Sequence, residues 1–142
     1  MKINLFGWLC TVLLALCSTL SFAETKSLYE RIGGEAVVQK VTEQTLQQMV
    51  TNPEVSQSFH KVNMDKLAKK IAEHTCAITD GGCKYTGDEI KLVHAGLNIT
   101  ENEYYALVEA LRAALDANGV GEQEKNELLR LLAPMKRDVI TK

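Results

Sequence analysis

Hydrophobic positions recur at intervals of three and four residues over most of the chain, which is the spacing of amphipathic helices. The clearest stripes lie near the C-terminus: Leu107, Leu111, Ala114 and Leu115 form one, and Leu128, Leu131, Leu132, Met135 and Val139 form another. No segment combines sustained two-residue alternation with β-branched enrichment, so the pattern predicts an all-α chain. We expect the two helices that carry these stripes to pack antiparallel as the structural floor of the domain.

Capping residues and helix breakers set the expected boundaries. The segments Ser27 to Glu30 and Thr100 to Glu103 each have the sequence of a capping box. Glycine pairs and Asn-Pro or Asn-Gly steps mark the breaks between helices. The expected helices are a short one ending at Gly33-Gly34, followed by 35–51, 63–80, 88–95, 102–117 and 121–140, with a turn at 53–60. Pro134 should kink or fray the last of them, since proline removes a backbone donor.

The first 23 residues have the features of a secretory signal. Lys2 precedes an apolar run from about Leu5 to Leu20, and Ser21-Phe22-Ala23 places small residues where signal peptidase cleaves. The alternative is an uncleaved membrane anchor, since the run approaches spanning length. We expect cleavage after Ala23, which leaves residues 24–142 as one domain in a bacterial periplasm or outside the cell, without a membrane attachment.

The overall composition is that of an ordinary globular domain. Hydrophobic residues make up 46% of the chain, charged residues 24%, and the formal net charge is −2. These values exclude a disordered tail, a collagen and a polytopic membrane protein. A dedicated nucleic-acid binder usually carries a basic excess, so we expect no nucleic-acid partner. The chain also lacks a Gly-x-Ser-x-Gly elbow and a glycine-rich phosphate loop, so no hydrolytic or nucleotide site competes.

Two of the four cysteines lie in the expected mature domain. Cys10 and Cys17 leave with the signal, whereas Cys76 and Cys83 remain. In an oxidising compartment such a pair is a candidate disulfide. Two free buried thiols are the alternative.

Several segments, taken in order, resemble the group 1 truncated haemoglobins. Ser27 to Gly34 resembles the opening of that family, Gly81-Gly82 and Tyr85-Thr86-Gly87 resemble its glycine motifs, and Val93 to Ile99 resembles its proximal-histidine segment. The match covers Ser27 to Val139. The resemblance implies a truncated globin, a two-over-two helical sandwich around non-covalently bound haem b. Covalent attachment is excluded, because the chain has no Cys-x-x-Cys-His.

The resemblance implies that His94 is the proximal iron ligand. A haem iron needs an imidazole on one axial face, held on a rigid element that faces an apolar slot. His94 lies near the end of the expected 88–95 helix, with Ile90 and Val93 beside it and Ile99 after it. Gly87 lets the chain turn sharply into that helix. By residue type alone, the alternative is a surface histidine on a short helix.

The distal side departs from the family pattern. Many group 1 members place a tyrosine on the second helix and a glutamine on the long helix to hydrogen-bond bound oxygen. Here those positions fall on Leu46 and Ile71. The other expected haem contacts are Phe59, Met64, Leu67, Tyr85, Ile90, Val93 and Ile99. Because bound dioxygen is held more weakly without a donor, this departure argues against efficient oxygen storage and nitric oxide dioxygenation.

Lys70 and His74 are the polar candidates on the distal helix. Lys70 falls where some family members place a histidine that binds the iron as a sixth ligand. An amine binds iron only when deprotonated, and the reference pKa of lysine, about 10.4, opposes this. The alternative is that Lys70 reaches a haem propionate or solvent. His74 is either a third distal candidate or a pocket-lining side chain without iron contact.

These residues give three functional hypotheses. The first is a haem protein that binds oxygen or nitric oxide on the iron held by His94, with redox chemistry on nitric oxide or nitrite as a secondary activity. The second is a six-coordinate electron-transfer or haem- or redox-sensing globin with Lys70, or else His74, as internal ligand. The third is a helical interaction domain that has lost haem. If Cys76 and Cys83 pair, the bridge would tie the end of the distal helix to the turn that leads to His94. The electron donor is not specified by the sequence, and no catalytic residue is assigned.

Overall fold

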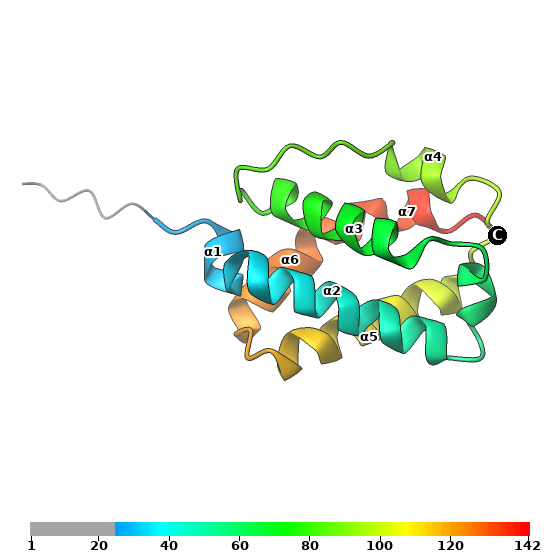
Figure 1. The fold of residues 1–142 in the computed structure, drawn as a ribbon, viewed down its shortest axis with the longest axis horizontal. Helices are drawn as coiled ribbons and strands as arrows, with labels where there is room; N and C mark the ends of the chain where they lie inside the picture. The colour runs from blue at the N-terminus through cyan, green and yellow to red at the C-terminus, as the bar shows by residue number, and fades with distance from the viewer. Residues whose placement is uncertain (1–24) are drawn as a thin grey trace, which may run out of the picture.

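The computed structural model describes residues 25–142, and the signal predicted for residues 1–23 lies outside the described residues. The elements are α1 (Leu28–Ile32), α2 (Gly34–Thr51), the 3-10 helix η1 (Ser56–Phe59), α3 (Met64–Ile78), α4 (Ile90–His94), α5 (Glu101–Ala117), α6 (Glu122–Leu132), the 3-10 helix η2 (Ala133–Met135) and α7 (Lys136–Val139). Within this range no strand occurs, which confirms the all-α prediction (Figure 1). None of these helices is both long and apolar enough to cross a membrane.

Side-chain caps start three of the helices where the sequence predicts. The Ser27 hydroxyl accepts a hydrogen bond from the Glu30 backbone N–H at 3.2 Å, and the Glu30 carboxylate accepts one from the Ser27 N–H at 2.9 Å. Thr100 and Glu103 form the same reciprocal pair before α5. Asn63 caps α3 by accepting from the Lys66 N–H at 2.9 Å. Each cap satisfies backbone donors that have no partner inside the helix and contributes about 1 kcal/mol.

Two expected helices differ from the observed ones. The short helix expected at 88–95 is only Ile90–His94. The last helix, expected at 121–140, is divided into α6, η2 and α7, with Pro134 inside η2. Since Pro134 cannot donate a backbone hydrogen bond, the chain passes through a 3-10 turn there, and the predicted kink is confirmed.

Gly33 separates α1 from α2 because its backbone adopts a conformation that favours glycine. Its φ is 121°, in the region that other residues rarely adopt. A Cβ atom placed there would also lie 2.4 Å from Cγ2 of Val37. The first glycine motif of the sequence is therefore a conformational requirement.

The main hydrophobic core joins the first described helix, α1, to α6, which lies 90 or more residues later in the chain. Its buried members are Leu28, Ile32, Val38, Val41, Ala114, Leu115, Val120 and Leu128, which come from α1, α2, α5, α6 and the α5–α6 connection. The most extensive helix contacts are those of α2 with α5 and of α2 with α3. In Figure 1, α2 accordingly runs between α3 and α5.

The expected antiparallel packing of the last two helices against each other stays a prediction, and their hydrophobic stripes have further partners. The two stripes do meet in the main core through Leu115 and Leu128. However, the most extensive contact of α5 is with α2. The most extensive contact of α6 is with α1.

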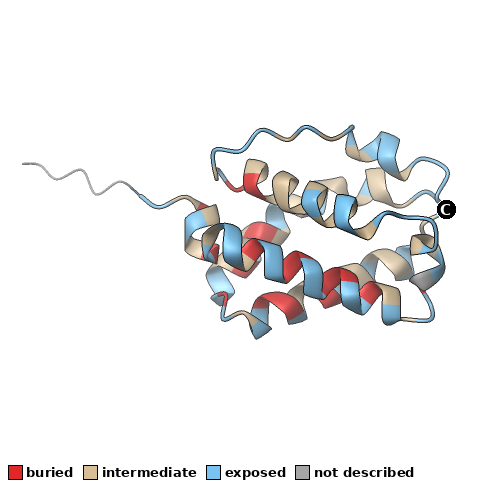
Figure 2. Cartoon of the chain, in the orientation of Figure 1, coloured by how far each residue is buried: buried red, intermediate tan, exposed pale blue. Residues whose placement is uncertain are grey.

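Burial is uneven across the molecule. Most buried residues lie on α1, α2, α5 and α6 (Figure 2). Cys76 is the one fully buried residue of α3, and no residue of α4 or α7 is fully buried. Yet α3 is clearly amphipathic, with Met64, Leu67 and Ile71 spaced three and four residues apart on one side. All three are only half-buried. The side of the fold that contains α3 and α4 thus keeps apolar surface that the protein itself does not cover.

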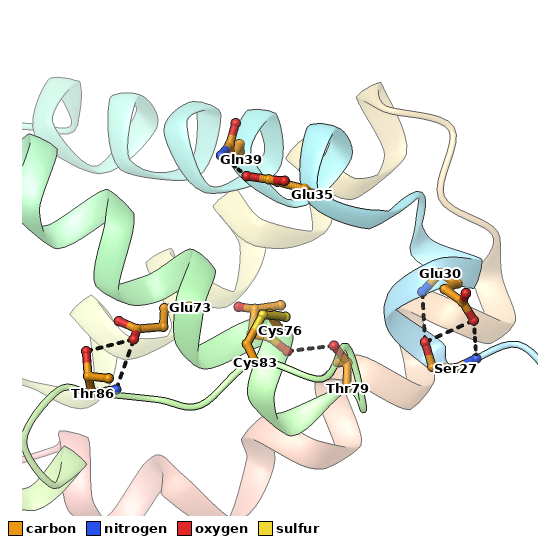
Figure 3. The surroundings of a disulfide bond; sticks show 10 residues. Ser27, Glu30, Glu35, Gln39, Glu73, Cys76, Thr79, Cys83 and Thr86 are labelled. Carbon is orange, nitrogen blue, oxygen red and sulfur yellow. Dashed lines mark hydrogen bonds between the residues drawn. A yellow bond between two sulfur atoms is a disulfide. The ribbon is translucent and has the colours of Figure 1, made fainter.

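Cys76 and Cys83 form a disulfide, with their Cα atoms 5.7 Å apart (Figure 3). Cys76 is 1% exposed in the last turn of α3, and Cys83 lies in the exposed segment that follows. The bridge spans a sequence separation of 7 and ties the end of α3 to the chain that leads to α4. The sequence left this pairing open, and the structure selects the disulfide over free thiols.

Removing this bridge should lower the stability of the domain by about 2 kcal/mol, the loop-entropy value for so short a loop. The variant Cys76→Ala/Cys83→Ser tests this by urea unfolding of the haem-free protein. A reductant should destabilise the wild type by a similar amount and leave the variant unchanged. Equal midpoints for the oxidised wild type and the variant would contradict the prediction.

Candidate functional site

His94 is the last residue of α4, and its ring is oriented by the backbone of the same helix. Its Nδ1 lies 2.6 Å from the carbonyl oxygen of Ile90, one turn earlier. A carbonyl oxygen only accepts hydrogen bonds, so in the neutral ring Nδ1 carries the proton and Nε2 keeps its lone pair. Metal-ligating histidines are commonly fixed in this way through their second nitrogen. His94 is therefore a half-buried imidazole with the tautomer that a metal ligand requires.

The residues around His94 form an apolar surface that is left partly open. Val93 is 42% exposed and Leu97 is 49% exposed, whereas Ile90 and Ile99 are half-buried. The helix α4 makes its most extensive contact with α7, and none of its residues is buried. The sequence correctly indicated an apolar setting for His94, and the structure shows that protein side chains alone do not close it.

The segment that leads into α4 is shaped by Tyr85 and Gly87. The Tyr85 hydroxyl donates to the Asp88 carbonyl at 3.1 Å. A Cβ atom at Gly87 would lie 2.1 Å from that hydroxyl oxygen. Gly87 has no positive φ. It is needed because the Tyr85 side chain folds back over it, a reason that differs from the sharp turn expected from the sequence.

The other predicted site residues fall into two groups. Leu46 on α2 is buried, so the rest of the protein already covers its side chain. The half-buried members are Phe59 on η1, Met64, Leu67, Lys70, Ile71 and His74 on α3, and Tyr85 in the following segment. Phe59 also packs against a second core cluster with Met49 and Val55. The α3 residues thus present an apolar side interrupted by two polar groups, Lys70 and His74.

The ammonium group of Lys70 is bound on two sides. It donates to Oε2 of Glu73 at 2.7 Å and to Oγ1 of Thr86 at 2.5 Å. Oε1 of Glu73 in turn accepts from the Thr86 hydroxyl at 2.7 Å and from the Thr86 N–H at 3.1 Å. The hydrogen bond from Lys70, followed by that from Thr86, lowers the pKa of Glu73 below its ordinary value. We call Lys70, Glu73 and Thr86 the Lys70 cluster.

Sequence reasoning did not identify Glu73 as a site residue, and it named Thr86 only as part of the Tyr85-Thr86-Gly87 motif. One local signal was available, because a glutamate three residues after a lysine on a helix can pair with it. Nothing in the sequence indicates that Thr86, sixteen residues from Lys70, completes the cluster.

His74 lies against Tyr85, with ring centroids 5.0 Å apart in an edge-on arrangement. Burial lowers the pKa of His74 below its ordinary value. The neutral ring is therefore the favoured form near pH 7, as in a pocket-lining side chain. Whether His74 contacts a ligand stays a prediction.

This pKa shift has a consequence for stability. A histidine whose pKa is lowered by folding binds protons more readily in the unfolded chain, so stability is lost as the pH falls below about 6.5. Urea unfolding of the haem-free protein between pH 7.5 and 5 should show a smaller loss in His74→Gln than in the wild type. His60→Gln is the control, because His60 is exposed. Parallel pH profiles for His74→Gln and the wild type would contradict the expectation.

The donor set and the apolar surfaces fit one kind of bound group. A flat apolar ligand with a metal at its centre would cover the open sides of α3 and α4 and take an axial ligand from a neutral imidazole. His94 supplies that imidazole, with Nε2 as the available nitrogen. The fold and this site together define an all-helical protein of the globin type.

Comparison with known proteins assigns the family. Residues 27–141 match the family described as bacterial-like globin, and this chain belongs to it. A curated relative, "Group 1 truncated hemoglobin GlbN" from Mycolicibacterium paratuberculosis, is 33% identical over 119 residues, which are 84% of this chain and 88% of that protein. A second, "Group 1 truncated hemoglobin" from Tetrahymena thermophila, is 23% identical over 116 residues, 82% of this chain and 96% of that protein.

Solved structures confirm the fold. The truncated hemoglobin of Tetrahymena pyriformis in its Fe(III) form superposes with a TM-score of 0.77 at 23% identity, covering 82% of this chain and 100% of that one. The group II truncated hemoglobin of Bacillus anthracis gives a TM-score of 0.72 at 19% identity, covering 82% and 92%. The chain is thus a truncated globin with the two-over-two helical sandwich. Its globin family implies haem binding and, through haem, the binding of small gaseous ligands.

Proposed function

We propose that this protein binds haem b non-covalently and holds its iron through Nε2 of His94, leaving the opposite face for oxygen or nitric oxide. The observation that carries the proposal is the 2.6 Å contact between Nδ1 of His94 and the Ile90 carbonyl oxygen. It fixes both the tautomer and the direction of the ring. The partly open apolar surfaces of α3 and α4 and the truncated haemoglobin relatives support the same function.

When bound, haem supplies an iron that takes up diatomic gases and changes oxidation state. The residues of this chain supply the rest. The Ile90 carbonyl makes the His94 imidazole a stronger donor by accepting its second N–H. Leu46 and Ile71 offer no hydrogen bond at the positions where relatives of the family carry donors. The apolar side of α3 excludes water, so we expect weak retention of oxygen and little discrimination against nitric oxide or carbon monoxide.

Titration of the purified haem-free protein with haem tests this function. We expect one haem per chain, a sharp Soret band, and ferrous complexes with carbon monoxide, oxygen and nitric oxide. A protein that shows no Soret shift on haem addition would contradict the proposal and leave the helical interaction domain as the function. Redox chemistry on nitric oxide or nitrite is proposed as a secondary activity. It is measured as nitric oxide consumption by the oxygen-loaded ferrous protein and as nitrite reduction by the ferrous protein with a chemical reductant.

We further propose that the mature chain starts at Glu24 and works in the periplasm or outside the cell. The Cys76–Cys83 disulfide supports an oxidising compartment. The intact mass of protein purified from the periplasmic fraction of an expressing bacterium tests this. A mass that retains residues 1–23 would contradict cleavage after Ala23.

The alternative function is an internally ligated globin for electron transfer or haem or redox sensing. It requires the Lys70 amine to leave Glu73 and Thr86 and to lose its proton. It predicts a low-spin, six-coordinate spectrum for the wild type, and slow binding of added gases because Lys70 must first be released.

A further inference from the structure

The segment 83–86 is fastened to the last turns of α3 at three places. The disulfide joins Cys76 to Cys83, the ring of His74 packs on Tyr85, and Glu73 accepts two hydrogen bonds from Thr86. The partners on α3 have decreasing residue numbers as those on the segment increase, so the two run antiparallel. Figure 3 shows the disulfide and the Glu73–Thr86 hydrogen bonds on the same side of α3.

The covalent contact sets the register of the other two. With Cys83 bonded to Cys76, Thr86 cannot slide along α3 without breaking its bonds to Glu73. Thr86 then faces Lys70, one turn further back along the helix, and gives the ammonium group its second acceptor. Of the three N–H donors of Lys70, two are engaged in this cluster.

We propose that Glu73 and Thr86 are positioning residues that hold the Lys70 ammonium group away from the sixth coordination position of the haem iron. This inference rests on the proposed function, because it concerns the iron that His94 would hold. The cluster keeps the iron open to external gases by giving the competing side chain other partners. Glu73 would therefore determine whether the protein binds external gases or uses Lys70 as an internal ligand.

The chemistry of the cluster supports this role. An ammonium ion has no lone pair and cannot bind a metal. The Glu73 carboxylate pairs directly with this ammonium group, with Nζ and Oε2 2.7 Å apart. Thr86 accepts from Lys70 while donating to Glu73, so the three groups satisfy one another. The neighbouring Lys66 and Lys69 are exposed, and they serve as references for an ordinary surface lysine.

The first test uses the haem-free protein. Acetylation by an amine-reactive reagent, followed by mass spectrometry, measures the reactivity of each lysine. In Glu73→Gln, which keeps the size of the side chain and removes its charge, Lys70 should react about threefold faster or more, because the ion pair that holds its amine is lost. Lys66 and Lys69 should be unchanged. An unchanged Lys70 rate in both Glu73→Gln and Thr86→Val would overturn the positioning role, and circular dichroism checks that each variant is folded.

The second test uses the ferric haem-loaded protein at pH 8. Glu73→Gln should gain a low-spin, six-coordinate component that is absent from the wild type and from Glu73→Asp. The same component should be missing from Glu73→Gln/Lys70→Ala, a dependence that a purely structural role of Glu73 would not produce. A low-spin component that persists in the double variant, or one already dominant in the wild type, would overturn the inference.

The two tests separate this inference from the proposed function. If no variant takes up haem, the proposed function fails, and the coordination role fails with it. The acetylation rates still decide whether Glu73 holds Lys70. If haem binds through His94 and Glu73→Gln changes neither measurement, only the positioning role is contradicted.

Discussion

His94→Ala is expected to lower haem affinity on the order of 100-fold or more, because it removes the proposed protein ligand to the iron, and loss of supporting residues alone costs 10–100-fold. The substitution removes the ring whose Nδ1 is held by the Ile90 carbonyl and whose Nε2 is available. The remaining apolar contacts of haem would still give weak binding. The measurement is the rate of haem transfer from the loaded protein to an excess of a high-affinity acceptor.

The chain offers a matched control in His60, one of its three histidines. His60 is exposed and follows η1, so His60→Ala should keep the wild-type rate and spectrum. The variant His94→Gly adds a second check, since free imidazole should restore the proximal ligand and the Soret band. Wild-type affinity and spectrum in His94→Ala would contradict the assignment and move the search for a ligand to His74 or Lys70.

Leu115→Ala is expected to cost the haem-free domain about 3 kcal/mol of stability. Leu115 is 0% exposed and belongs to the main core, where α5 meets residues of α1, α2 and α6. Truncation removes buried apolar area and leaves a cavity that the surrounding helices cannot fill without moving. Since domains are typically stable by about 5–15 kcal/mol, this is a large fraction of the total.

Urea unfolding of the haem-free protein measures the effect, with Leu131→Ala as the matched control. Leu131 lies on α6 and is 40% exposed. Its truncation should cost less than about 1 kcal/mol, since little area is removed from contact with protein. Equal losses in the two variants would mean that the main core is not centred on Leu115.

The sequence predicted the helices well because their signals are local. Ser27 and Thr100 cap helices through bonds to residues three positions away, and Gly33 ends α1 because of its own φ. Pro134 divides the last helix for the same kind of reason. The boundaries of α4 were less accurate, since a helix of five residues is held mainly by its contact with α7.

The candidate site was predicted in part. The family motif placed His94 on a short helix in apolar surroundings, and the structure shows both features. Within the Lys70 cluster, the spacing of Lys70 and Glu73 gave a local signal. The sequence did not indicate Thr86, because Thr86 meets Glu73 only after the chain has turned back along α3. The same folding back brings Cys83 to Cys76.

The sequence by itself therefore determined the helical class of this protein and the starts and breaks of most helices, since each depends on a residue and its near neighbours. Only the tertiary structure decided that α5 packs chiefly on α2, that the two cysteines pair and that Thr86 joins Lys70 and Glu73. These contacts join segments whose distance in space is set by how the helices pack, and no local pattern of residues fixes that distance.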